Sequence, residues 1–160
     1  MNAEVSGFDP SQFLDATTTE AATKLPPLPV GDYIGTVGEP KIREWESKRE
    51  DAKVKSGYAL DIPVTVDLSE YPELKSLLGS TSQYTLTTGV FFDTVPGTKS
   101  LDWGVGKNGQ LRRWREALDL NRPGEAFSLR MFQGRRIRIK VKHDPYQGEI
   151  YSKIDSVSKA

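Results

Sequence analysis

Cysteine is absent from the 160-residue sequence, and histidine occurs once, as His143. Without cysteine the chain has no disulfide framework and no thiolate chemistry, and a single histidine leaves no Cys/His cluster that would hold zinc. A lone histidine is more often structural than a general base. Asp and Glu are scattered, with no close pair that the pattern places on one face. We therefore expect a protein that is not an enzyme and that uses no metal or cofactor.

Long hydrophobic runs are also missing. No apolar stretch approaches the roughly 20 residues that span a bilayer, and the N-terminus lacks the basic-then-apolar pattern of a secretory signal. Hydrophobic residues make up 36% of the sequence and charged residues 28%, as in ordinary soluble globular proteins. At this length we expect one domain with a sizeable core and no membrane partner.

The net charge is zero at neutral pH, which by itself argues against a polyanionic partner. The charge is unevenly distributed, however. Residues 1–40 hold six acidic residues against one lysine, whereas residues 107–160 hold thirteen basic residues against six acidic ones. This asymmetry weakens the objection to an anionic partner, because one third of the chain is strongly basic.

The most informative stretch is residues 134–143, in which apolar and cationic side chains alternate. Period two predicts a strand with one buried face, here carrying Ile137, Ile139 and Val141. The other face carries four cations, namely Arg136, Arg138, Lys140 and Lys142. Because like charges side by side destabilise a strand, this row is either a solvated or edge face, or a surface that binds an anionic partner.

A second strand follows a turn at residues 144–148, and the two strands form a C-terminal hairpin. Residues 149–157 alternate again, with Tyr151 and Lys153 on the outer side, and Tyr146 lies in the predicted turn. Aromatic rings beside cations are typical of proteins that bind single-stranded nucleic acid, because the cations follow the phosphates and the rings stack on bases.

Three further strands are predicted upstream. They cover residues 33–45, 59–66 and 83–92. A bulge or bend is expected in the first strand at residues 38–40, and Pro63 favours an edge or bulged position for the second.

Two helices are predicted between these strands and the hairpin. The first covers residues 70–78, with Ser69 as its cap and Gly79 as its stop. The second covers residues 109–120, with Asn108 as its cap and Trp114 on an apolar stripe that faces the core.

The five strands and two short helices predict a mainly β fold, and the usual architecture of this size is the five-stranded oligonucleotide-binding (OB) barrel. We expect this barrel over residues 30–160, after a flexible acidic arm and a proline-rich linker over residues 1–29. In such a barrel the loops after strands one and four flank the binding groove. Here these are residues 46–56 and the loop of Tyr146.

Four further side chains fall on outward faces of their strands. They are Lys41, Arg43, Trp45 and Phe91. Each outward aromatic residue of the chain has two interpretations, a structural ring shielded from solvent and a platform for stacking, and the sequence favours neither.

The stretch Gly104-Val105-Gly106-Lys107-Asn108-Gly109 matches the spacing G-x-G-x-x-G of dinucleotide-binding folds. That fingerprint requires a buried strand before it, and Leu101-Asp102-Trp103 is too short and too polar. A glycine-rich loop ahead of a helix explains the match, although such a helix start, with Lys107 nearby, also suits a phosphate of DNA.

An ordered set of motifs resembles phage-encoded single-stranded DNA-binding proteins. The similar stretches are residues 12–14, 29–33, 56–61, 101–102, 111–118, 134–136 and 143–151. The resemblance implies an OB barrel that coats and protects single-stranded DNA during phage replication, recombination or repair. It also implies phage replication or recombination proteins as partners, and the cytoplasm of the infected bacterial cell as the location. Many such proteins carry an acidic C-terminal tail, whereas the acidic residues of this chain lie in its N-terminal arm.

The first hypothesis is therefore sequence-tolerant binding of single-stranded DNA. The cations assigned to phosphates are Lys41, Arg43, Arg136, Arg138, Lys140, Lys142 and Lys153, and the rings assigned to bases are Trp45, Phe91, Tyr146 and Tyr151. The second hypothesis is a protein-interaction module of phage origin that uses the same barrel and binds no nucleic acid. The third is a metal-dependent enzyme that acts on nucleic acid.

Overall fold

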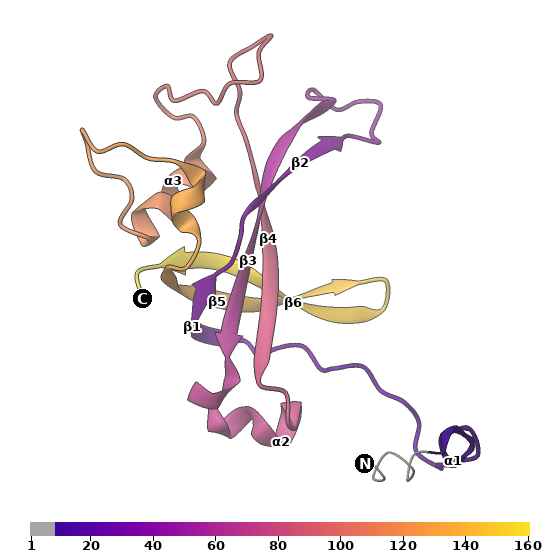
Figure 1. Ribbon diagram of the computed structural model, residues 1–160. Helices are drawn as coiled ribbons and strands as arrows, with labels where there is room; N and C mark the ends of the chain where they lie inside the picture. The colour runs from indigo at the N-terminus through magenta and orange to yellow at the C-terminus, as the bar shows by residue number, and fades with distance from the viewer. Residues whose placement is uncertain (1–8) are drawn as a thin grey trace, which may run out of the picture.

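The computed structural model describes residues 9–160, and Figure 1 shows their path. The first eight residues of the predicted arm, including Phe8, lie outside the described part. The strands are β1 (Gly31–Val37), β2 (Lys41–Glu46), β3 (Ser56–Asp67), β4 (Gln83–Phe91), β5 (Arg136–Tyr146) and β6 (Glu149–Ser158). The helices are α1 (Pro10–Leu14), α2 (Lys75–Leu78) and α3 (Gly109–Ala117), with 3-10 turns η2 (Leu68–Glu70), η3 (Pro72–Leu74) and η4 (Leu129–Phe132).

The six strands form one antiparallel sheet, which confirms the predicted mainly β fold. The order of paired strands is β2-β3-β1-β5-β6, and β4 also pairs with β3. β2 and β1 pair with successive parts of one edge of β3, and β4 pairs with its other edge. The sheet is not closed, because no backbone ladder joins β4 to β6. The two strands nevertheless approach each other, and the Ser152 and Tyr84 hydroxyls lie 3.3 Å apart.

The predicted first strand is divided into β1 and β2, so the sheet has six strands rather than five. Val37 lies opposite Val64 and Lys41 opposite Asp61, so three residues face two across this break. This is the predicted bulge at residues 38–40. It also explains Pro63, for which an edge or bulged position was predicted: the bulge is confirmed, whereas β3 is a central strand with partners on both sides.

Pro63 is tolerated in a central strand because its missing N–H falls at the bulge. The Gly38 N–H donates to the Pro63 carbonyl over 2.8 Å. The N–H and C=O of one residue point to the same side of a strand, so a donor at Pro63 would face the irregular residues 38–40 rather than a ladder partner.

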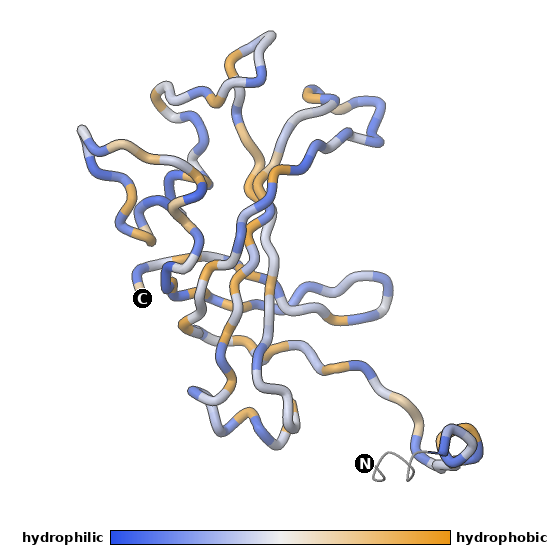
Figure 2. Tube along the Cα trace, viewed as in Figure 1, coloured by the Kyte–Doolittle hydropathy of each residue, from blue (hydrophilic) through white to orange (hydrophobic). Residues whose placement is uncertain are grey.

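The core lies between the inner face of the sheet and α3. Figure 2 shows hydrophobic segments gathered where the strands cross, whereas the outlying loops carry both hydrophilic and hydrophobic segments. The predicted stripe of α3 is confirmed, since Leu111 is fully buried, Trp114 is 3% exposed and Leu118 is 4% exposed. Phe132 of η4 is also fully buried and lies 6.4 Å from Trp114 between ring centroids.

The end of the proline-rich linker docks on this core. Leu28 is fully buried. Its carbonyl lies 2.9 Å from the His143 Nε2, and the Tyr33 hydroxyl donates to the Pro29 carbonyl over 2.8 Å. The contact gives His143 a structural role. The predicted boundary between residues 1–29 and 30–160 stays a prediction.

The predicted helix at residues 70–78 is wrong in its extent. This stretch forms η2, η3 and the single turn α2 instead. Tyr71 breaks the helix with φ −129° and ψ 66°, because a residue before proline is disfavoured in the helical region. The capping side chain belongs to Asp67, which accepts from the Ser69 N–H over 3.0 Å, and Gly79 ends α2 as expected.

Candidate nucleic-acid interface

Four of the predicted site residues share the outer face at one end of the sheet. On β2, Lys41, Arg43 and Trp45 lie opposite Asp61, Ala59 and Gly57 of β3, and Phe91 of β4 lies opposite Ala59 from the other edge. Directly opposite residues project from the same face of a sheet. The fold therefore brings together side chains that are 46 to 50 positions apart in the sequence, from Trp45 and Lys41 to Phe91.

Arg43, Trp45 and Phe91 form a compact group, which we call the Trp45–Phe91 cluster. The Trp45 and Phe91 rings meet edge to face with centroids 5.6 Å apart, and the Arg43 guanidinium lies 6.0 Å from the Phe91 centroid. Phe91 is 54% exposed, so part of its ring is open to a ligand. The cluster thus offers an aromatic surface with a cation beside it.

Gly57 gives the cluster its shape. The Trp45 indole lies directly over Gly57, and a Cβ at that position would stand 3.0 Å from the Trp45 Cζ2 and Nε1 atoms. Trp45 is half-buried, and its Nε1 is buried without a hydrogen-bond partner among the described residues. Most of the stacking surface accessible to a ligand therefore belongs to Phe91, with Trp45 as its support.

The charge of Arg43 is partly committed within the protein. Its Nε and one Nη donate to the two Asp61 carboxylate oxygens over 2.9 and 3.2 Å. These bonds raise the pKa of Arg43. They also hold the guanidinium near the Phe91 ring. Within residues 9–160 the Lys41 ammonium has no carboxylate oxygen within 4 Å, so it is the freer cation of this face.

The predicted cationic row lies on β5, and its alternation is confirmed. Ile137, Ile139 and Val141 are fully buried, whereas the four cations of the row are exposed. We call Arg136, Arg138, Lys140 and Lys142 the β5 cation row.

Both ends of the row are paired. Arg136 lies 3.4 Å from Glu70, and Lys142 lies 3.2 Å from Asp155, at the bulge of β6. In the described chain, Arg138 and Lys140 in the middle have no carboxylate within 4 Å. Free positive charge therefore concentrates at these two residues.

Tyr146 and Tyr151 meet at the tip of the β5–β6 hairpin. Their ring centroids lie 6.5 Å apart, and both side chains are exposed. The Tyr151 hydroxyl donates to Glu149 over 2.7 Å, which raises the pKa of Tyr151. Lys24, directly before the proline-rich linker, lies 2.5 Å from Glu149 and, together with Tyr151, lowers the pKa of that carboxyl. Lys153 lies opposite Lys142 on the neighbouring strand, so like charges face each other.

An open groove runs between β4 and the hairpin, with a volume of about 690 Å³. Its lining consists of residues 24–27, 84–87 and 148–152. Tyr151 is the one predicted site residue in this lining, and Thr85 and Thr87 of β4 were missed. No local pattern marks these threonines, because the groove exists only once β4 and β6 approach each other. In Figure 1 the β2–β3 turn and the β5–β6 hairpin project to the same side of the molecule.

The Trp45–Phe91 cluster and the β5 cation row are separate on the sheet. Arg136 lies opposite Thr36, which lies opposite Thr65 on β3. Thr65 is six residues along β3 from Ala59, which neighbours the cluster, so the two groups are about 20 Å apart along the strand. The structure therefore supports two groups of predicted residues and not one continuous patch.

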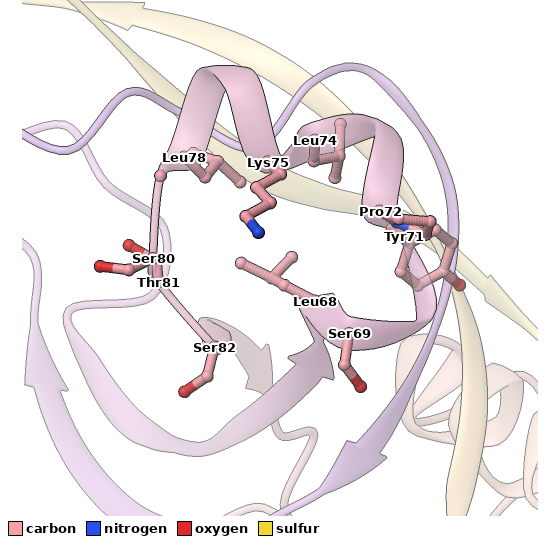
Figure 3. Close-up of a pocket in the computed structure, with 11 residues that line it drawn as sticks. Leu68, Ser69, Tyr71, Pro72, Leu74, Lys75, Leu78, Ser80, Thr81 and Ser82 are labelled. Carbon is pink, nitrogen blue, oxygen red and sulfur yellow. The ribbon is translucent and has the colours of Figure 1, made fainter.

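A further hollow, shown in Figure 3, lies at the connection between β3 and β4 and has a volume of about 350 Å³. Its walls are largely apolar and include Leu68, Leu74 and Leu78, and the Lys75 ammonium projects over Leu68. None of the predicted site residues lines it, and the hydroxyls of Ser80 and Thr81 point away from Lys75. Tyr71 is the one aromatic residue of its lining and Lys75 the one cation, so it lacks a group of cations.

Residues 9–160 contain no group of three or more His, Cys, Asp or Glu side chains placed to hold a metal ion. Within the same residues, no helix has the length and apolar character needed to cross a membrane. The glycine-rich loop before α3 follows an isolated antiparallel bridge between Thr94 and Leu101, which differs from the parallel β-strand context of a dinucleotide site. Comparison with known protein families matched no family model, and a search of curated proteins found no relative.

Proposed function

We propose that this protein binds single-stranded DNA with little sequence preference and acts as a coating protein rather than an enzyme. Its open sheet corresponds in this proposal to an OB barrel in which β1 and β2 together form the first strand. Such barrels are partly open and bind oligonucleotides across strands two and three, here β3 and β4. The resemblance to phage proteins supports a role in phage replication, recombination or repair within the infected cell.

The observation that carries the proposal is the Trp45–Phe91 cluster on the outer face of β2, β3 and β4. Phe91, which is 54% exposed, in edge-to-face contact with Trp45 and flanked by Arg43, is a surface on which a base can stack. Base–aromatic stacking contributes about 1–3 kcal/mol per base and tolerates any sequence, since every base has a π-face. A solvated structural face has no need of an exposed ring in this position.

The positions of the free charges agree with this function. Lys41 lies on the same face as the cluster, and Arg138 and Lys140 carry unpaired charge on β5. These cations give a strand of DNA phosphate contacts both at the cluster and on β5. Duplex DNA should bind more weakly, because its bases are not available for stacking.

Titration of the intrinsic tryptophan fluorescence with oligo-dT, at low and high salt, tests the proposal. Trp114 is 3% exposed, so quenching reports on Trp45 and Trp103. We expect saturable quenching by the single strand, weaker binding at high salt and much weaker binding of a duplex of the same length. If neither fluorescence nor a gel shift detects binding, the proposal is refuted and the basic face is better explained as a surface for a protein partner.

A further inference from the structure

A second surface with an aromatic ring and cations lies beside α3, away from all the residues assigned above. The loop before the helix and the helix itself enclose a hollow of about 390 Å³, which we call the Trp103 pocket. Trp103, Lys107, Arg112 and Arg115 are among its lining residues, and no Asp or Glu side chain is. In Figure 1 the loop that carries Trp103 leads from the upper end of β4 over to α3.

The Trp103 ring is exposed but held in place. Its side chain is 58% exposed. The ring meets Phe127 edge to face at 6.4 Å, and the Arg115 guanidinium lies 5.7 Å from its centroid and 4.0 Å from that of Phe127. The Arg115 Nε donates to the Leu120 carbonyl over 3.0 Å, which fixes the guanidinium. A base that stacks on a ring already ordered in this way loses little side-chain entropy.

Lys107 and Arg112 supply the charge of the pocket. Across residues 9–160 the Lys107 ammonium has no carboxylate within 4 Å. Arg112 pairs with Glu116 over 3.6 Å, and both side chains of this pair are largely exposed, so a phosphate can compete for the guanidinium. The pocket therefore combines an ordered ring with two accessible cations, which is the combination that binds one nucleotide of a single strand.

Asn108 connects this pocket rigidly to β4. Its side chain is 5% exposed, accepts from the Asp93 N–H over 2.9 Å, and donates to the Asp93 and Asp102 carbonyls over 2.9 and 2.8 Å. The Asp102 N–H donates to the Asp93 carbonyl over 2.9 Å. Along this connection the Cα atoms of Trp103 and Phe91 are no more than about 19 Å apart. One binding domain of this kind covers about 4–16 nucleotides, so one strand can reach both rings.

We propose that the Trp103 pocket binds a further nucleotide of the strand that occupies the Trp45–Phe91 cluster, with the base on Trp103 and its phosphate at Lys107 and Arg112. This inference rests on the proposed function and extends it, since it lengthens the binding site around the end of β4 to α3. It gives the exposed tryptophan and the glycine-rich loop a common role.

The test compares dissociation constants for oligo-dT of about 3 and about 20 nucleotides, lengths below and beyond the limits of one domain. Trp103→Ala should weaken binding of the long strand by about 5- to 150-fold, the equivalent of one stacked base. It should leave the short strand, which the Trp45–Phe91 cluster holds alone, unchanged. Trp103→Phe should retain most of the affinity, and Lys107→Gln with Arg112→Gln should weaken the long strand and reduce its salt dependence.

Val105→Ala is the matched control, because Val105 lies in the same loop, is fully exposed and does not line the pocket. If the wild-type protein binds neither strand, the proposed function fails. If it binds both and Trp103→Ala leaves the long strand unaffected, or weakens both lengths equally, then the Trp103 pocket is not part of the site and the proposed function stands.

Discussion

Replacing Phe91 by alanine tests the Trp45–Phe91 cluster most directly. Phe91 is 54% exposed and projects from the outer face of β4. If a base stacks on its ring, the loss of about 1–3 kcal/mol should raise the dissociation constant for oligo-dT by about 5- to 150-fold. The edge-to-face contact with Trp45 accounts for about 0.5–1.5 kcal/mol of folding stability, so the variant should remain folded.

Ile42→Ala is the matched control for this change. Ile42 is 56% exposed, close to the value for Phe91, but lies opposite Leu60 and therefore projects from the other face of the sheet. Both variants lose an exposed apolar side chain from the same end of the sheet. Only Phe91→Ala should weaken DNA binding, measured by fluorescence anisotropy of a labelled oligonucleotide.

Two results would refute the stacking argument. Affinity within twofold of the wild type, in a Phe91→Ala protein that urea denaturation shows to be folded, would mean that no base lies on this ring. An equal loss of affinity in Ile42→Ala would mean that the change acts through the stability of β2, β3 and β4. Phe91→Leu separates apolar contact from stacking, since it keeps most of the apolar area without the ring.

Three further changes test other parts of the structure. Arg138→Glu with Lys140→Glu should abolish measurable binding at moderate salt, because the unpaired charge of the β5 cation row is reversed. Lys75→Glu with Arg130→Glu makes an equal change of charge elsewhere and should have a much smaller effect. Equal effects of the two double variants in a gel shift would contradict a localised site. Asn108→Gly keeps the left-handed backbone at φ 52° but removes three side-chain hydrogen bonds. The free energy of unfolding, measured by urea denaturation, should therefore fall by about 1.5–4.5 kcal/mol. An unchanged free energy of unfolding would show that the Asn108 hydrogen bonds do not hold the loop. Lys24→Gln should raise the pKa of Glu149 toward its ordinary value, because the principal bond that lowers this pKa is lost. An NMR titration that finds no rise would show that Lys24 does not dock at the hairpin tip.

Local patterns were sufficient for the strands and for the face that each presents. Strict alternation in residues 134–143 correctly separated Ile137 and Ile139 from Arg138 and Lys140, because the period of a strand depends on its own backbone geometry. The C-terminal hairpin and the apolar stripe of α3 were likewise predictable. The helix at residues 70–78 was not, since the restriction that Pro72 places on Tyr71 outweighed the helical propensity of the residues around it.

Ion pairs and edge positions required the tertiary structure. Nothing near Arg136 or Lys142 in the sequence shows that Glu70 and Asp155 neutralise them, or that Asp61 holds Arg43. The sequence left an edge and a bulged position open for Pro63, and the register between β1, β2 and β3 places it opposite the bulge. Such pairings depend on how distant strands align, which no local period encodes.

The sequence by itself thus determined the mainly β class, the alternation that exposes the cations of β5, and the outward direction of Trp45 and Phe91 along their own strands. Only the tertiary structure decided which of these side chains meet: Trp45 joins Phe91 across β3, Tyr146 joins Tyr151 at the hairpin tip, and Trp103 stands with Arg115 and Phe127 beside α3. The physical reason is that a strand fixes the direction of its side chains within a few residues, whereas a binding surface depends on register and curvature set by the packing of the whole core.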